Sequence, residues 1–175
     1  MTVAAASREA RFEALFDEHA LAVHRYVARR THTSDVDDIV ADVFLVAWQK
    51  IDAIPDDFQQ PWLFRTAWNV LANRRRKFVE LPFEHLPEDP RDGDIADVVV
   101  EDVTLREAWL SLGARDREVL RLVAWDGLNG AELAAALGIS VSGAGVALSR
   151  ARARFAAACT ETSSETTTFM GRGDR

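Results

Sequence analysis

The sequence predicts an all-α protein made of two small helical domains that are joined by an acidic linker. Apolar residues recur at the three- and four-residue spacing of amphipathic helices, as at Val36, Ile39, Val40 and Val43. The segment 80–101 interrupts this pattern with three prolines and eight acidic residues, a composition that breaks helices and extends the chain. No stretch of the sequence predicts a strand. These observations together indicate a three-helix domain, a linker and a four-helix domain.

The first domain, residues 1–79, is expected to contain three helices. Ser7 and Ser34 are candidate N-caps of the first two helices, because a serine hydroxyl can accept a hydrogen bond from a free backbone N–H. Pro61 suits the first turn of the third helix, where a missing N–H costs nothing. The expected ranges are 8–30, 35–51 and 61–78.

The second domain, residues 102–158, is expected to contain four helices. Thr104 with Glu107, and Asn129 with Glu132, have the spacing of a capping box, which starts a helix. Glycines that can end a helix stand at three places along this domain. They are Gly113, Gly127 and Gly138, so the helices are expected at about 104–112, 115–126, 129–137 and 141–157. The tail, residues 159–175, is rich in Thr, Ser and Gly and is predicted to be disordered.

Charge is distributed unevenly along a chain whose formal net charge is −7. Residues 65–79 carry five basic residues and no acidic one, whereas residues 80–107 carry a net charge of −8. A local basic stripe of this kind is typical of a nucleic-acid contact even in an acidic protein.

Composition excludes several classes of protein. A hydrophobic content of 48% excludes a wholly disordered chain, and no apolar run is long enough to span a bilayer. The first residues lack the basic and apolar segments of a signal peptide, so we expect a cytoplasmic protein without membrane insertion. The single cysteine, Cys159, excludes an intramolecular disulfide and a multi-cysteine zinc site.

Residues 127–155 have the pattern of a helix-turn-helix: a short helix, a glycine turn at Gly138 and a second helix. Leu133, Leu137 and Leu148 fall where the two helices must pack on each other. Arg150, Arg152 and Arg154 place positive charge along the last helix, where it can contact phosphates. The simpler interpretation is a helical hairpin with a solvated arginine face.

Residues 61–78 combine aromatic, amide and basic side chains on one helix. Rings can stack on unpaired bases, amides can bind base edges, and guanidinium groups can hold the nucleic-acid backbone. This combination predicts a site for single-stranded DNA. The alternative is that Trp62 and Trp68 are core residues and that the terminal arginines only complement the helix dipole.

Residues 36–51 form a third functional candidate. Acidic residues and the aromatics Phe44 and Trp48 stand beside the apolar stripe of this helix. Such a helix can dock on a basic groove of a partner protein. The alternative is an ordinary amphipathic helix with a solvated acidic face.

An enzyme is not expected. The histidines His19 and His24 are five residues apart and diverge on a helix, so they do not have metal-ligand spacing. The sequence contains no glycine-rich phosphate loop and no nucleophile elbow. We therefore expect no catalytic residue, no metal and no cofactor.

The motifs DDIVADVFLVAWQKI, PWLFRTAWNVLANRRR and RDREVLRLVAWDGLNGAELAAALGIS, in this order, resemble the extracytoplasmic-function group of the sigma-70 family. Residues 12–78 resemble region two and residues 104–155 resemble region four. The resemblance implies a protein that binds core RNA polymerase, recognises the minus-ten and minus-thirty-five promoter elements and helps to open the DNA. It also implies an anti-sigma partner, and we expect the free chain to be a monomer.

The resemblance implies three sets of site residues. Polymerase binding is assigned to Asp38, Asp42, Phe44, Leu45 and Trp48. Binding of the minus-ten element is assigned to Arg65, Trp68, Asn69, Asn73, Arg74, Arg75, Arg76 and Lys77, with Asn69 at the pocket for a flipped base. Binding of the minus-thirty-five element is assigned to Ser140, Ser142, Ser149, Arg150, Arg152 and Arg154.

The expected recognition helix departs from the pattern of the family at its centre. The family usually carries Lys or Arg there, whereas this chain has Gly145 and Ala147, with Gly143 nearby. A helix without these side chains cannot make a bidentate contact to guanine at those positions. Two alternative functions therefore stay open from the residues alone: a dimeric helix-turn-helix regulator that is not a polymerase subunit, and a protein-interaction module.

Overall fold

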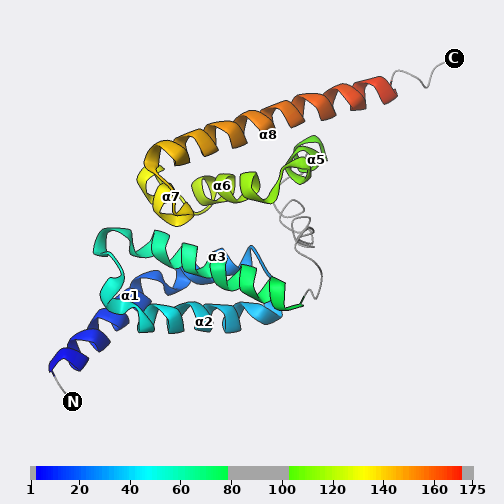
Figure 1. The fold of residues 1–175 in the computed structure, drawn as a ribbon. Coiled ribbons are helices and arrows are strands. Elements are labelled where there is room, and N and C mark those ends of the chain that lie inside the picture. Colours follow the sequence, from blue (N-terminus) through cyan, green and yellow to red (C-terminus); the bar gives the residue numbers. More distant parts are fainter. Residues whose placement is uncertain (1–2, 79–102, 171–175) are drawn as a thin grey trace.

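The computed structural model describes residues 3–78 and 103–170, and every regular element in these ranges is a helix. The predicted all-α class, with three helices followed by four, is confirmed. The first three helices form one bundle, and the last four form a second unit that lies against it (Figure 1). The expected acidic linker, 80–101, lies outside the described residues.

The N-terminal bundle consists of α1 (Val3–Ala28), α2 (Val36–Gln49) and α3 (Gln59–Phe78). Short 3-10 helices at Thr33–Asp35, Ile51–Ala53 and Asp56–Phe58 connect them. The predicted apolar stripe of the second helix is confirmed, because Val36, Ile39, Val43 and Ala47 are all buried. Pro61 lies in the first turn of α3, as expected.

Two N-caps predicted for this bundle are wrong. Ser7 lies inside α1, which starts at Val3, because the alanines that precede Ser7 have the highest helix propensity and continue the helix. Ser34 lies in a 3-10 helix, and α2 has Asp35 at its N-cap with no side-chain capping bond.

The C-terminal unit consists of α5 (Val103–Ser111), α6 (Ala114–Ala124), α7 (Gly130–Leu137) and α8 (Val141–Met170). The predicted capping box of α7 is confirmed: Asn129 Oδ1 accepts from the N–H of Glu132 at 3.1 Å, and Glu132 Oε2 accepts from the N–H of Asn129 at 2.8 Å. The predicted cap at Thr104 is wrong, because α5 already starts at Val103.

The last helix is longer than the sequence predicts. The expected end at residue 157 is corrected by the structure, in which α8 continues to Met170. The expected disorder is likewise corrected for residues 159–170, whereas the rest of the tail, 171–175, lies outside the described residues. The stretch beyond 157 contains neither proline nor glycine before Gly171, so nothing in the backbone stops a helix that is already formed.

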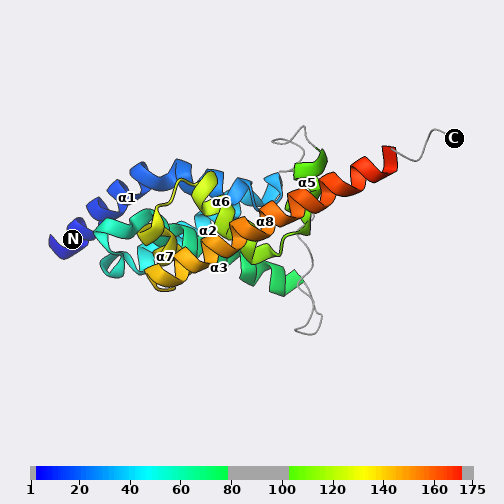
Figure 2. The same cartoon turned by 90° about the horizontal axis from the view of Figure 1, so that it is seen from above.

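The two units share one hydrophobic core. Buried residues of the bundle such as Leu63 and Phe64 belong to the same cluster as Leu122 and Leu133 of the C-terminal unit. In both views α6 and α7 lie over the bundle, with α7 packed on α3, and α8 runs along their outer side (Figures 1 and 2). The sequence predicted two domains but not this direct packing.

A charged cluster is also buried between the units. Arg30, which is 2% exposed, lies next to Tyr26 and makes ion pairs with Glu118 and Asp126 of the other unit. Burial raises the pKa of Tyr26 well above its usual value, and the Glu118 carboxylate raises it further. Burial by itself lowers the pKa of Arg30, but Tyr26, Glu118 and Asp126 together raise it by more. The guanidinium therefore stays charged inside the protein.

Within the described part of the chain, no single helix is both long enough and apolar enough to cross a membrane. The segments Gly130–Leu137 and Val141–Glu161 meet these criteria only as a pair, and they are bent by 96° relative to each other.

Two glycines of the C-terminal unit should respond in opposite ways to alanine. Gly138 has a φ of +66°, which costs an L-residue about 1–2 kcal/mol, and an added Cβ there would lie 2.6 Å from Arg65 Cζ. At Gly145, inside α8, an added Cβ meets no described atom within 4 Å, so alanine should stabilise the protein by about 1 kcal/mol. We expect Gly138→Ala to lower and Gly145→Ala to raise the midpoint of thermal unfolding measured by circular dichroism. Shifts of the same sign would contradict this account.

Candidate functional site

The exposed face of α2 carries apolar and acidic side chains together. Leu45 is 55% exposed and Trp48 is 37% exposed. Asp38 is exposed and Asp42 is half-exposed on the same helix. Four of the five side chains predicted to bind polymerase are therefore accessible, and they are brought together by one helix.

Phe44 is the exception, because it is 4% exposed. Its ring packs edge-on against Phe16, with the ring centres 4.7 Å apart, and against Phe12 at 6.3 Å. A direct contact of Phe44 with a partner is therefore corrected to a supporting position beneath the surface. The aromatic spacing in the sequence did not show this, because it does not reveal which ring α1 covers.

Phe16 is a surface residue that the sequence analysis did not assign. It is 42% exposed, although its spacing on α1 is that of a core residue. Phe12 lies between α1 and α2, where it also contacts the ring of Trp48 with the centres 5.3 Å apart. We refer to the exposed set of Phe16, Asp38, Asp42, Leu45 and Trp48 as the α2 surface.

The α3 helix presents a polar and aromatic ridge beside the α2 surface. Arg65, Trp68, Asn69 and Asn73 are all exposed, and Trp68 is 37% exposed. Arg65, Asn69 and Asn73 follow each other at four-residue spacing, so they lie one above another on one helix face. We refer to these four residues as the α3 ridge. The alternative that Trp68 is a core residue is wrong.

Arg74 connects the α3 ridge with the α2 surface. Its Nη2 lies 2.8 Å from Asp42 Oδ2, and both side chains are partly exposed. The pair has one member from the predicted polymerase set and one from the predicted DNA set. Arg75, Arg76 and Lys77 lie in the last turns of α3, and their side chains are outside the described part of the structure.

The helix-turn-helix is present as predicted. Leu133 and Ala134 of α7 and Ala144 of α8 are buried where the helices cross, and Gly138 forms the turn in the left-handed conformation. Ser140 has a local role, because its Oγ accepts a hydrogen bond from the N–H of Gly143 at 3.1 Å at the start of α8. The other predicted residues of this helix, Ser142, Ser149, Arg150, Arg152 and Arg154, are exposed.

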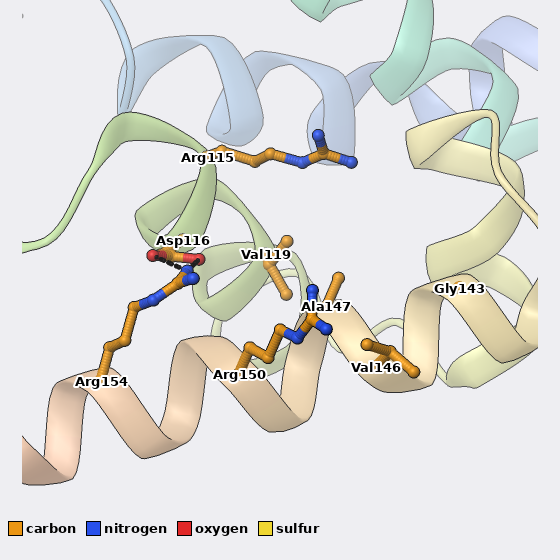
Figure 3. Close-up of a pocket in the computed structure, with 8 residues that line it drawn as sticks. All are labelled: Arg115, Asp116, Val119, Gly143, Val146, Ala147, Arg150 and Arg154. Carbon is orange, nitrogen blue, oxygen red and sulfur yellow. Dashed lines mark hydrogen bonds and ion pairs between the residues drawn. The ribbon is translucent and has the colours of Figure 1, made fainter.

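A basic cavity of about 280 Å³ lies between α6 and α8. Figure 3 shows Arg115 reaching over it from α6 while Arg150 points into it from α8. Arg154 lies at its edge, where its Nη1 binds both carboxylate oxygens of Asp116 at 2.7 and 2.8 Å. Arg154 is thus neutralised by a neighbour, whereas neither Arg115 nor Arg150 has a charge partner among the described residues.

Arg115 was missed by the sequence analysis. Its position in the first turn of α6 is far from the last helix in the sequence, and only the packing of α6 on α8 places it beside Arg150. Among the described residues, no group of three His, Cys, Asp or Glu side chains is placed to hold a metal ion.

Comparisons with known proteins match both units. The family described as "Sigma-70 region 2" matches residues 15–78, and the family described as "Sigma-70, region 4" matches residues 103–155. The chain therefore belongs to the sigma-70 family.

Curated relatives refine this assignment. The ECF RNA polymerase sigma factor SigL of Mycobacterium tuberculosis is 29% identical over 145 residues, which are 78% of this chain and 82% of that protein. The RNA polymerase sigma factor CnrH of Cupriavidus metallidurans is 33% identical over 123 residues, which are 62% and 64% of the two chains.

Solved structures agree with the relatives. CnrH in complex with the cytosolic domain of CnrY is similar with a TM-score of 0.57 and 30% identity, and the match covers 83% of this chain and 85% of CnrH. RpoE of Bartonella quintana in complex with the anti-sigma factor NepR shares the fold, with a TM-score of 0.58, 20% identity and coverage of 85% and 96%. Within the sigma-70 family, the chain is a sigma factor of the extracytoplasmic-function group.

Proposed function

We propose that this sigma factor binds core RNA polymerase through the α2 surface and captures an unpaired promoter base on the α3 ridge. The observation that supports the proposal most is the pair of accessible surfaces on adjacent helices, one apolar and acidic, the other aromatic and amide-bearing. It would act in the cytoplasm by binding alone, without catalysing a reaction itself. Co-purification with core polymerase, followed by run-off transcription, tests the function as a whole.

Burial of the α2 surface can supply the affinity for polymerase. Leu45, Trp48 and Phe16 expose apolar area that water solvates poorly, and its removal from water gives about 25 cal/mol per Å². Asp38 stands at the edge of this area and can pair with a basic group of the partner. An apolar centre with a charged rim is the usual anatomy of a protein interface.

The α3 ridge has the chemistry to hold a flipped base. Stacking of a base on an aromatic ring contributes about 1–3 kcal/mol, and Trp68 offers such a ring. The amide of Asn69 lies one residue further on and can bind a base edge. Flipping a base costs a few kcal/mol, so these contacts together with those made by polymerase can shift the equilibrium towards open DNA.

The helix-turn-helix would bind the minus-thirty-five element chiefly through the phosphates of the DNA backbone. Arg115 and Arg150 present two guanidinium groups across one cavity, which suits a phosphate. Gly145 in the second turn of α8 has no side chain with which to bind a base edge. Readout of base sequence would then depend on Ser142 and Ser149.

An anti-sigma protein is the second partner that we propose. Two similar structures are complexes, one of CnrH with the cytosolic domain of CnrY and one of RpoE with the anti-sigma factor NepR. An anti-sigma factor that covered the α2 surface would bury the same apolar side chains that polymerase needs. The alternative of a dimeric regulator gains no support from the comparisons.

Leu45 provides a direct test of the α2 surface. Truncation of a side chain that anchors an interface costs more than about 1 kcal/mol, so Leu45→Ala should weaken binding of core polymerase roughly five- to ten-fold. Leu21, which is 60% exposed on α1, is the matched control, and Leu21→Ala should leave the affinity unchanged. Titration against core polymerase measures both variants. Equal affinities would contradict the assignment.

Asn69 tests the α3 ridge. Removal of its amide in Asn69→Ala should reduce promoter opening by about ten-fold, because a good base-edge contact is worth about 1–3 kcal/mol. Binding of core polymerase should be unchanged, since Asn69 lies outside the α2 surface. Permanganate reactivity of unpaired thymines reports opening, and a gel shift reports binding. A parallel loss of both would reject the role of Asn69.

The cavity arginines should determine part of the salt dependence of DNA binding. Each phosphate contact that is lost lowers the slope of log K against log salt by about 0.9. We expect Arg115→Ala with Arg150→Ala to flatten the slope for a holoenzyme on promoter DNA by close to two such steps. Arg154→Ala, which removes a guanidinium already paired with Asp116, should change it less. Equal slopes in all three proteins would argue against a phosphate at the cavity.

A further inference from the structure

The first turns of α8 expose two valines that the packing of the protein does not use. Val141 is 60% exposed and Val146 is 49% exposed, whereas Ala144 and Ala151 of the same helix are 0% exposed. The helix therefore packs through its alanines and leaves the valines facing solvent. An exposed valine by itself needs no ligand, so what matters is the position of Val146 and the chemistry of its neighbours.

Val146 belongs to the side of α8 that a DNA groove would meet. Ser142, Gly145, Val146 and Ser149 are all exposed, and their spacing of three and four residues places them on one side of the helix. They lie in the first three turns of α8, which starts at Val141. In a helix-turn-helix the first residues of the second helix contact the base edges. We refer to these four exposed residues as the α8 face.

Positive charge stands directly beside the α8 face. Val146 lines the same cavity as Arg115 and Arg150, and it precedes Arg150 by one helical turn (Figure 3). A phosphate bound by the two guanidinium groups would bring bases of the same DNA segment to the α8 face. The face itself carries no charge. An uncharged centre with a basic edge is complementary to a groove of duplex DNA, where base edges lie between two rows of phosphates.

The α8 face has little chemistry with which to select a polar base edge. Gly145 and Val146 have no side-chain donor or acceptor, and a serine hydroxyl both donates and accepts, so it can bond to several bases. In the major groove, thymine is the base that presents an apolar group, its 5-methyl. Val146 can bury such a methyl group against its own two. A face of this composition therefore distinguishes A·T from G·C pairs through the thymine methyl.

Gly145 is a second observation that points outward from the same face. An added Cβ at Gly145 would meet no described atom within 4 Å, so packing within the protein does not require a glycine here. A glycine in a helix interior weakens the helix. The absence of a Cβ does, however, let the helix backbone come closer to a ligand. A groove that α8 enters deeply would give this glycine a use.

We propose that the α8 face reads thymine methyl groups in the major groove of the minus-thirty-five element, with Val146 as the residue that determines specificity. The inference rests on the proposed function, because promoter DNA is the ligand that would meet this face. It goes beyond the phosphate contacts of Arg115 and Arg150, since phosphates carry no direct information on sequence. Gly145 allows α8 to approach the base edges closely enough for Val146 to reach a methyl group.

The test removes the methyl group from the DNA and the valine from the protein. Holoenzyme made with the full-length chain first selects its preferred minus-thirty-five element from duplexes randomised there. Each thymine of the selected element is then replaced by deoxyuridine, which lacks only the 5-methyl. At one thymine or more, wild-type holoenzyme should bind about four-fold more weakly after the replacement, the value expected for one buried methyl group. With Val146→Ala, the thymine and deoxyuridine duplexes should bind equally.

Two control variants separate this effect from a general loss of binding. Val146→Ile keeps an aliphatic side chain and should keep the preference for thymine. Leu21→Ala removes an aliphatic side chain that is 60% exposed on α1, and it should keep the preference as well. Val146→Ala should also leave the slope of log K against log salt unchanged, because no phosphate contact is lost. A selected element without A·T pairs, equal wild-type binding of thymine and deoxyuridine duplexes, or a preference that persists in Val146→Ala would overturn the proposal.

Gly145→Ala tests the close approach of the helix. The variant should weaken binding of the selected promoter at least three-fold, because the added Cβ stands between α8 and the base edges. Binding of a promoter with a scrambled minus-thirty-five element should be unchanged. A higher midpoint of thermal unfolding in the same variant would show that the loss is not caused by misfolding. A variant that binds the selected promoter as tightly as the wild type would contradict the close approach.

Failure of methyl reading and failure of the proposed function give different results. If the wild-type chain does not bind core polymerase, the proposed function is wrong, and the same selection and deoxyuridine comparison with the chain alone then decides whether the α8 face reads thymine. If the holoenzyme forms and selects a promoter element but binds thymine and deoxyuridine duplexes equally, only the reading of methyl groups is wrong.

Discussion

The buried charge of Arg30 is the constraint on which the arrangement of the whole molecule depends. A guanidinium that is 2% exposed must be surrounded by acceptors, because the cost of burying it unpaired is several kcal/mol. From the preceding turn of the chain, the carbonyl oxygen of Tyr26 accepts one hydrogen bond from its Nη1. The carboxylates come from Glu118 and Asp126, so the C-terminal unit is held in the one orientation that brings both to Arg30.

This orientation determines which surfaces remain accessible. The C-terminal unit lies over the bundle with α7 packed on α3, while the α2 surface and the α3 ridge keep exposed apolar and amide groups. Two different kinds of partner can therefore be bound by adjacent helices of one small bundle. The Asp42–Arg74 ion pair joins the two surfaces and is partly exposed, so its own contribution to stability is small.

Local sequence signals predicted much of the fold because they act within one helix or turn. The capping box at Asn129 and Glu132 and the turn at Gly138 involve only near neighbours, and both were predicted. Signals that compete with stronger ones failed. Ser7 could have capped a helix, but α1 already starts at Val3, because the alanines before Ser7 favour a helix. In the same way, α8 extends past its expected end because no proline or glycine stops it.

The sequence by itself determined the helices, the turn between α7 and α8 and the residue types that suit each partner, since these follow from spacing and from the chemistry of single side chains. Only the tertiary structure decided that Phe44 is covered while Phe16 is exposed, that Arg115 joins Arg150, and that Arg30 meets Glu118. Each of these depends on which face of one helix another helix covers. Periodicity shows that a helix has an apolar face, but it does not show which distant segment packs against it.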